Sequence, residues 1–246
     1  MSAHASVLAR TAQSRHRIDT NIDALASGVT TIDEWRARLF VDAGFTGNGA
    51  DYHDVRNSFL PDVLHRKLGI PISIAVVGRL VAERAGLTAW GIGLPGHFLL
   101  GVSTPGVPLG AWRHDEARIV DPFNGGRTMS LADVEMLFTV MFGPNHSFDR
   151  SMLNATSDEA TLVRMLANIK ANYARLRNLT GLMAVARLRT CLPDWTLDEG
   201  RELVRLLCVG GLLDEATEVL GVLDIRFPGA EEILSAERAR LARSLN

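Results

Sequence analysis

Residues 69–102 read GIPISIAVVGRLVAERAGLTAWGIGLPGHFLLGV, and the hydrophobic pattern of this stretch changes half-way along it. From Ile72 to Ala85 almost every residue is apolar, which predicts a helix that is buried on most of its faces. Pro71 suits the first turn of that helix, because its missing N–H would have no partner there. The apolar runs then become short and are bounded by glycine and proline, which predicts two strands at 87–94 and 97–102 joined by a tight turn.

The sequence on either side predicts further helices before this stretch and one more strand after it. Helical patterns occupy about 6–25, a segment that begins after Thr31, and a segment that begins near Asn57 and stops at Gly69. Thr31 precedes a glutamate by three residues, which is the spacing of a capping box. A third strand is expected at 117–120. Helices followed by antiparallel strands indicate an α+β fold with a central helix packed on the sheet.

The last third of the sequence shows only helical patterns. A polar stretch at 145–157 separates it from the first part, in which 44–49 and 104–115 are expected to be loops. Helix pairs that recur roughly every 30 to 35 residues are typical of tetratricopeptide-like stacking. We therefore expect two domains, 1–150 and 151–246. The helices of the second are expected at about 158–177, 181–191, 197–209, 212–226 and 230–245.

Composition narrows the classes of function. The formal net charge is -2, and the basic residues stand beside acidic ones, which argues against a nucleic-acid partner. Cys191 and Cys208 are too few for a disulfide framework and indicate a reducing compartment. The sequence has no signal-peptide core and no apolar run long enough for a bilayer, so we expect a cytoplasmic protein without membrane contact. No cofactor is expected, and no metal, because His53, Asp62 and His65 lack ligand spacing.

Three places in the sequence could carry chemistry. His97 opens a strand directly after the Pro-Gly turn, where the backbone would hold its ring rigidly. Asp121 ends the next strand, and its carboxylate could bond the imidazole and stabilise the charged ring. The start of the buried helix, with Ser73, offers free N–H groups and the positive end of the helix dipole. Such a helix start activates a nucleophile and can hold an oxyanion.

Three motifs around these residues resemble one known family. They are GIPISIA at 69–75, LPGHFLL at 94–100 and VDPFNGG at 120–126. They resemble the bacterial transglutaminase-like family that carries a tetratricopeptide-like tail, some of whose members are linked by name to the regulation of invasion genes. The resemblance extends over about residues 15–240. It implies a papain/transglutaminase-like core, with His97 and Asp121 in the positions of the family histidine and acid.

The resemblance also implies a cysteine at the start of the buried helix, and this sequence has none there. Ser73 is the nearest substitute, although the register could instead place Pro71 or Ile72 at that position. A serine hydroxyl is a poor nucleophile unless a base such as His97 removes its proton during attack. The expected substrate-binding residues are Asn57, Pro71 and Asn124.

These observations lead to one preferred function and one alternative. The preferred function is a pseudoenzyme: a binding or regulatory module whose degenerate cleft takes a peptide, a protein or an amine-bearing small molecule. The alternative is an active acyl-transferase or amide hydrolase that uses Ser73, His97 and Asp121. A third possibility is a scaffold that acts through its tail. Purely structural roles compete with all of these: a local hydrogen bond for Ser73, a buried carbonyl partner for His97, and a turn for Asp121.

Overall fold

The structure is a computed structural model that describes residues 3–107 and 117–245, with side chains for 13–107 and 117–244. The chain forms two compact units, Met1–Thr161 and Leu162–Asn246, called unit 1 and unit 2 below. Helices and an antiparallel sheet make up unit 1, and unit 2 is all-helical. The predicted α+β class with a helical tail is confirmed. None of the helices in the described ranges is long and apolar enough to cross a membrane.

Unit 1 is built around a four-stranded antiparallel sheet with the order β3-β4-β5-β6. Two further strands of two residues each, β1 and β2, pair in parallel. The strands are β1 (Thr46–Gly47), β2 (Leu68–Gly69), β3 (Thr88–Leu94), β4 (His97–Ser103), β5 (Ala117–Asp121) and β6 (Arg127–Met129). The helices are α1 (Ala3–Ala26), α2 (Ile32–Arg36), α3 (Leu60–Arg66), α4 (Pro71–Arg84) and α5 (Leu131–Phe142), with short helical turns at Ala37–Asp42, Val55–Ser58 and Arg150–Leu153.

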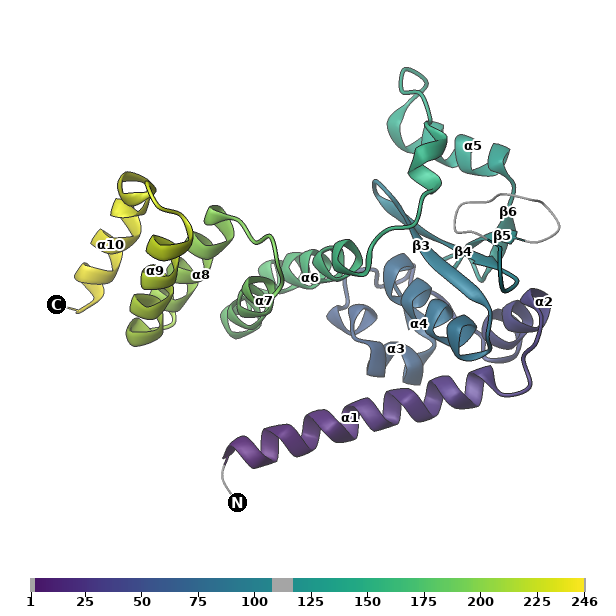
Figure 1. The fold of residues 1–246 in the computed structure, drawn as a ribbon, viewed down its shortest axis with the longest axis horizontal. Coiled ribbons are helices and arrows are strands. Elements are labelled where there is room, and N and C mark those ends of the chain that lie inside the picture. Colours follow the sequence, from purple (N-terminus) through teal and green to yellow (C-terminus); the bar gives the residue numbers. More distant parts are fainter. Residues whose placement is uncertain (1–2, 108–116, 246) are drawn as a thin grey trace. The chain divides into compact units, whose positions relative to one another are not determined.

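Helix α4 is the predicted apolar, buried helix, and it lies across β3 and β4 (Figure 1). Its close approach depends on Gly78, because a Cβ there would come within 2.9 Å of the Leu100 side chain of β4. The indole N–H of Trp35, which is fully buried, donates to the carbonyl oxygen of Gly78 at 3.0 Å. Leu99 precedes Leu100 in β4 and so faces the other side of the sheet, where it belongs to a second apolar cluster that includes Val134 of α5. The sheet therefore has buried residues on both faces.

Helix α3 and strand β2 correct the predicted helix end. The helix was expected to run to Gly69, but α3 ends at Arg66. Lys67 takes the left-handed conformation with φ 62°, and its N–H donates to the carbonyl oxygen of Val63. Residues 68 and 69 then pair with β1, so the predicted loop at 44–49 contains a short strand. Gly69 is needed for packing instead, because a Cβ there would lie 2.6 Å from Oγ of Ser73.

Other expectations are confirmed with small changes in length. The capping box at Thr31 is present, and Pro71 is in the first turn of α4. The predicted third strand continues to Asp121, while residues 108–115 of the predicted loop fall outside the described residues. Strand β6 and helix α5 were not predicted. Helix α5 nevertheless carries a readable start signal, because Ser130 caps it in a capping box with Asp133.

The helices of unit 2 follow the predicted ranges closely. They are α6 (Asp158–Arg175), which begins at the end of unit 1, α7 (Leu179–Cys191), α8 (Leu197–Val209), α9 (Leu213–Arg226) and α10 (Glu231–Leu245). Helices α8 and α9 approach closely at Gly200, where a Cβ would meet the side chains of Trp195 and Leu223. Glu237 on α10 is buried and lies 2.8 Å from Arg205 and 3.2 Å from Arg201, both on α8. Whether these helices form tetratricopeptide repeats stays a prediction.

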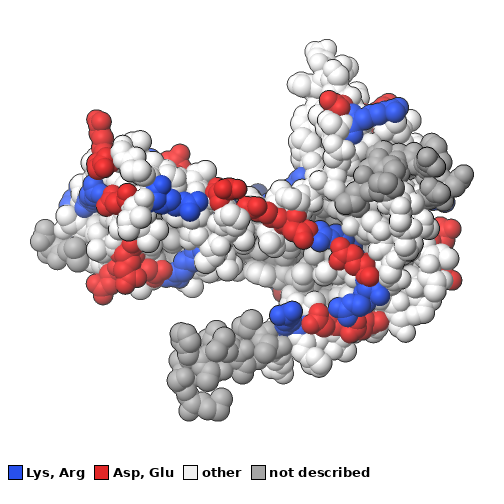
Figure 2. Space-filling model, in the orientation of Figure 1, with Lys and Arg blue, Asp and Glu red and all other residues white. Residues whose placement is uncertain are grey.

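Acidic and basic side chains alternate over the helices of unit 2 on the face that Figure 2 shows. Ion pairs link different helices of unit 2, as in Arg187–Glu215 and Arg189–Glu199, at 2.6 and 2.8 Å. Pairs at the surface stabilise a fold only slightly.

Candidate functional site

His97 and Asp121 are in contact at one end of the two central strands of the sheet, because His97 begins β4 and Asp121 ends β5. The antiparallel register places Leu100 opposite Val120, so continuing it makes His97 a diagonal neighbour of Asp121 on the same face. Nε2 of His97 lies 3.1 Å from Oδ1 of Asp121, which is the distance of an ion pair when the ring is protonated. The His97 side chain keeps 12% of its surface exposed, and that of Asp121 keeps 4%.

Asp121 is held as a carboxylate by the turn that follows it. Oδ1 accepts hydrogen bonds from the backbone N–H groups of Phe123 at 3.0 Å and Asn124 at 3.3 Å. Oδ2 accepts one from the side-chain amide of Asn124 at 2.7 Å. Burial raises the pKa of Asp121, but His97 and Asn124 together outweigh burial and hold this pKa below its usual value. Asp121 is therefore a fixed negative charge beside the His97 ring.

Ser73 lies in the first turn of α4, and its side chain is fully buried. Its hydroxyl oxygen lies 2.6 Å from the carbonyl oxygen of Asn57 and 3.0 Å from that of Ile70, and it accepts from the N–H of Ile70 at 3.1 Å. A hydroxyl has one proton to donate, and the short contact directs it to Asn57. The polar contacts that Ser73 makes are thus with backbone atoms that fix the start of α4.

Asn57, expected to bind substrate, is fully buried, and both ends of its amide bond to the protein. Nδ2 donates to the carbonyl oxygens of Asp51 at 2.7 Å and Tyr52 at 3.2 Å. Oδ1 accepts from Nδ2 of Asn48 at 3.1 Å and from Arg66 at 3.3 Å. The side chain of Asn57 therefore shapes the loop before it, while its carbonyl oxygen receives the Ser73 hydroxyl.

Strand β1 connects strand β2, which directly precedes α4, to the turn after Asp121. The N–H of Gly47 donates to the carbonyl oxygen of Phe123 at 2.8 Å, and the N–H of Asn48 donates to that of Gly69 at 2.9 Å. Gly47 also lies against the Phe123 ring, because a Cβ there would come within 2.3 Å of it. Of the predicted residues, His97, Asp121 and Asn124 thus form one group. Asn57, Ser73 and the buried Pro71 form a second group, and β1 ties the two together.

Sequence reasoning missed an aromatic surface beside this site. The ring centroids of Tyr52 and Phe123 lie 5.8 Å apart, and those of Tyr52 and His53 lie 5.4 Å apart. Tyr52 is 40% exposed, and the N–H of Phe123 bonds the same oxygen of Asp121 that faces His97. Tyr52 stands 71 positions before Phe123, so no local pattern could have joined them; only the aromatic residue inside the VDPFNGG motif gave a hint.

No metal site is evident among the residues with described side chains, since no three His, Cys, Asp or Glu residues gather closely enough to hold an ion. The described residues of the site offer the chemistry of an imidazole beside a carboxylate. Such a pair can accept or donate a proton and can bond an amide or hydroxyl group of a ligand.

Comparison with known proteins agrees with this arrangement. The sequence profile of the transglutaminase-like superfamily matches residues 3–167, which contain the sheet, α4, His97 and Asp121. The chain belongs to the transglutaminase-like superfamily. The superfamily match ends before both cysteines of the chain, Cys191 and Cys208.

Several curated proteins are similar to part of this superfamily member. A UPF0162 protein of Xylella fastidiosa is 33% identical over 167 residues, which cover 64% of this chain and 56% of that protein. A UPF0162 protein of Vibrio cholerae is 28% identical over 159 residues, with the same coverage. The human F-box only protein 21 is 28% identical over 108 residues, which cover 43% of this chain and 17% of that protein. No solved structure matches. The chain spans about half the length of the UPF0162 proteins.

Proposed function

We propose that this member of the transglutaminase-like superfamily is a pseudoenzyme that binds a peptide or protein segment without cutting or transferring it. The proposal rests on the start of α4, which lacks an available nucleophile. The matched region contains no cysteine, and the hydroxyl of Ser73 is buried and directed to the carbonyl oxygen of Asn57. A serine must give its proton to a base in order to attack an amide, and this proton is directed elsewhere.

The proposed binding surface is the His97–Asp121 pair together with the aromatic residues Tyr52 and Phe123. The fixed carboxylate of Asp121 orients the imidazole of His97, and the oriented ring can form a hydrogen bond with a peptide amide. The half-exposed tyrosine offers an apolar surface on which a side chain of the peptide can pack. Asn57 helps to fix this surface, because its side-chain amide donates a hydrogen bond to the carbonyl oxygen of Tyr52.

Unit 2 would then recruit a protein partner, in the manner of tetratricopeptide-like helices. The resemblance to proteins linked by name to invasion-gene regulation favours a regulatory role. The free cysteines Cys191 and Cys208 favour the cytoplasm as the place of action.

The test combines a reactivity assay with a binding assay on the full chain. A fluorophosphonate probe should not label Ser73. N-acetyl-phenylalanine N-methylamide, a minimal peptide, should shift the NMR signals of the His97 ring and of Tyr52 without being hydrolysed. Tyr52→Ala should weaken this binding, whereas Tyr52→Phe, which keeps the ring, should not.

Labelling of Ser73 that disappears in His97→Ala would instead establish the alternative, an acyl-transfer enzyme or amide hydrolase. Absence of both labelling and peptide-induced shifts in the folded protein would refute a role for this surface and favour a scaffold that acts through unit 2.

A further inference from the structure

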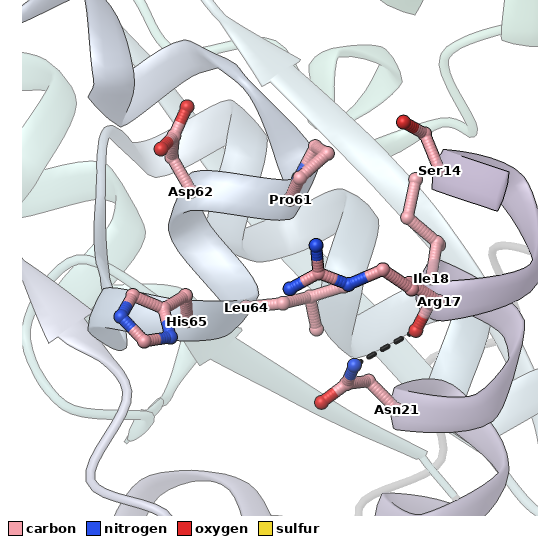
Figure 3. Close-up of a pocket in the computed structure, with 8 residues that line it drawn as sticks. All are labelled: Ser14, Arg17, Ile18, Asn21, Pro61, Asp62, Leu64 and His65. Carbon is pink, nitrogen blue, oxygen red and sulfur yellow. Dashed lines mark hydrogen bonds between the residues drawn. The ribbon is translucent and has the colours of Figure 1, made fainter. Parts of the chain in front are cut away.

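A groove of about 380 Å³ lies between α1 and α3, apart from the His97–Asp121 site. Figure 3 shows the guanidinium of Arg17 reaching from α1 across to α3, with Asp62 and His65 on the α3 side. The lining residues are Ser14, Arg17, Ile18, Asn21, Pro61, Asp62, Leu64 and His65. A volume of this size is in the range of small-molecule sites.

The groove is a fixed feature of unit 1, because α1 is anchored beyond it. Ile22 and Ala26, in the second half of α1, are buried. Arg84 at the end of α4 forms ion pairs with Asp23 and, at 3.8 Å, with Asp19 of α1. Asn21 also stiffens the wall, since its side-chain amide donates to the carbonyl oxygen of Arg17 at 2.7 Å.

The groove is lined by one cationic side chain, Arg17, and one anionic side chain, Asp62, and the two do not form an ion pair with each other. Among the described residues, neither Arg17 nor Asp62 forms an ion pair. The nearby Arg56, which Asp62 influences through space, is paired with Asp54 at 2.7 Å. One unpaired cation and one unpaired anion on facing helices favour a ligand that carries both charges.

We propose that this groove binds a free amino acid with an aliphatic side chain. The planar guanidinium of Arg17 can hold the ligand's carboxylate with two parallel hydrogen bonds. Asp62 pairs with the ammonium group. Ile18, Pro61 and Leu64 supply the apolar surface for the side chain. An inorganic anion would be repelled by Asp62, and an amine without a carboxylate would be repelled by Arg17.

The test is calorimetric or NMR titration of the full chain with L-leucine, leucine amide, N-acetyl-leucine and inorganic phosphate. The groove is open and its charges are partly hydrated, so we expect a dissociation constant of about 1 mM for leucine. Leucine amide lacks the carboxylate and N-acetyl-leucine lacks the ammonium group. Each should bind at least about tenfold more weakly, which corresponds to about 1.4 kcal/mol.

Two variants and one control assign the site. Arg17→Gln and Asp62→Asn should each weaken leucine binding about tenfold or more. Arg15→Gln changes the same residue type on the same helix but does not line the groove, and it should bind like the original protein. The proposal is overturned if leucine produces no signal up to about 20 mM, if phosphate or either derivative binds as well as leucine, or if Arg17→Gln leaves binding unchanged. Because these ligands do not report on His97, either outcome is independent of the peptide-binding proposal.

Discussion

Replacing Ser73 with alanine should lower the free energy of unfolding of unit 1 by about 2 kcal/mol. The change removes a donor from the carbonyl oxygen of Asn57 and an acceptor from the N–H of Ile70, both at a buried position. Each lost hydrogen bond costs roughly 1 kcal/mol, and an unsatisfied buried group costs more. The loss is limited because the N–H of Ile70 also donates directly to the carbonyl oxygen of Asn57 at 3.3 Å.

Ser58→Ala is the matched control for this measurement. Ser58 is also buried and is next to Asn57, but its hydroxyl has no hydrogen-bond partner among the described residues. Its removal should change the stability by no more than about 0.5 kcal/mol, because no bonded partner is left behind.

Urea unfolding followed by tryptophan fluorescence measures both variants. Trp35 is a suitable reporter, because its indole bonds a carbonyl oxygen of α4 itself. If Ser73→Ala proves as harmless as Ser58→Ala, the hydroxyl does not hold the start of α4, and the argument that its proton is committed to the backbone fails.

Three further predictions concern the turn after β5 and the ion pairs of unit 2. The pKa of Asp121 is lowered in the folded protein, so its stabilising contribution is present above the ordinary pKa of an aspartate and is lost as the pH falls through the lowered pKa. Asp121→Asn should therefore flatten the acid limb of a plot of unfolding free energy against pH. Gly126→Ala should cost about 3 kcal/mol, because its φ is +69° and a Cβ would collide with an aromatic ring, whereas Gly125→Ala, with φ +62° and open space, should cost only about 1 kcal/mol; thermal unfolding of both compares them. Glu237→Ala should destabilise unit 2 by about 1 to 2 kcal/mol in urea, because it removes the buried carboxylate that Arg201 and Arg205 contact, while Arg201 keeps Asp198 at 3.0 Å; an effect below that of an exposed pair would contradict this reasoning.

The sequence predicted those elements whose signal is local. The run from Ile72 to Ala85 has a helical period, and the following strands are short and punctuated, so both were readable. The same holds for the helices of unit 2. The end of α3 was misplaced because Lys67, a residue with a Cβ, adopts the left-handed conformation that usually marks glycine. Helix α5 was missed although Ser130 and Asp133 have capping-box spacing.

The site could be predicted only where strand order alone brings residues together. His97 and Asp121 end up in contact because each stands at one end of adjacent antiparallel strands. The partner of the Ser73 hydroxyl lies 16 residues away in a helical turn that has no periodic signal. The contact between Tyr52 and Phe123 depends on the loop that Asn57 shapes, so it follows from tertiary packing and from no property of either segment alone.

Strand β1 has a consequence for how a ligand can be received. Its two residues and the next one bind Lys67 and Gly69, just before the central helix, on one side and the Phe123 carbonyl on the other. Moving one half of the site relative to the other would break these backbone bonds together. Recognition should therefore proceed by lock-and-key fit to a preorganised surface, with little entropy lost by the protein and an association rate that does not wait for a closure step.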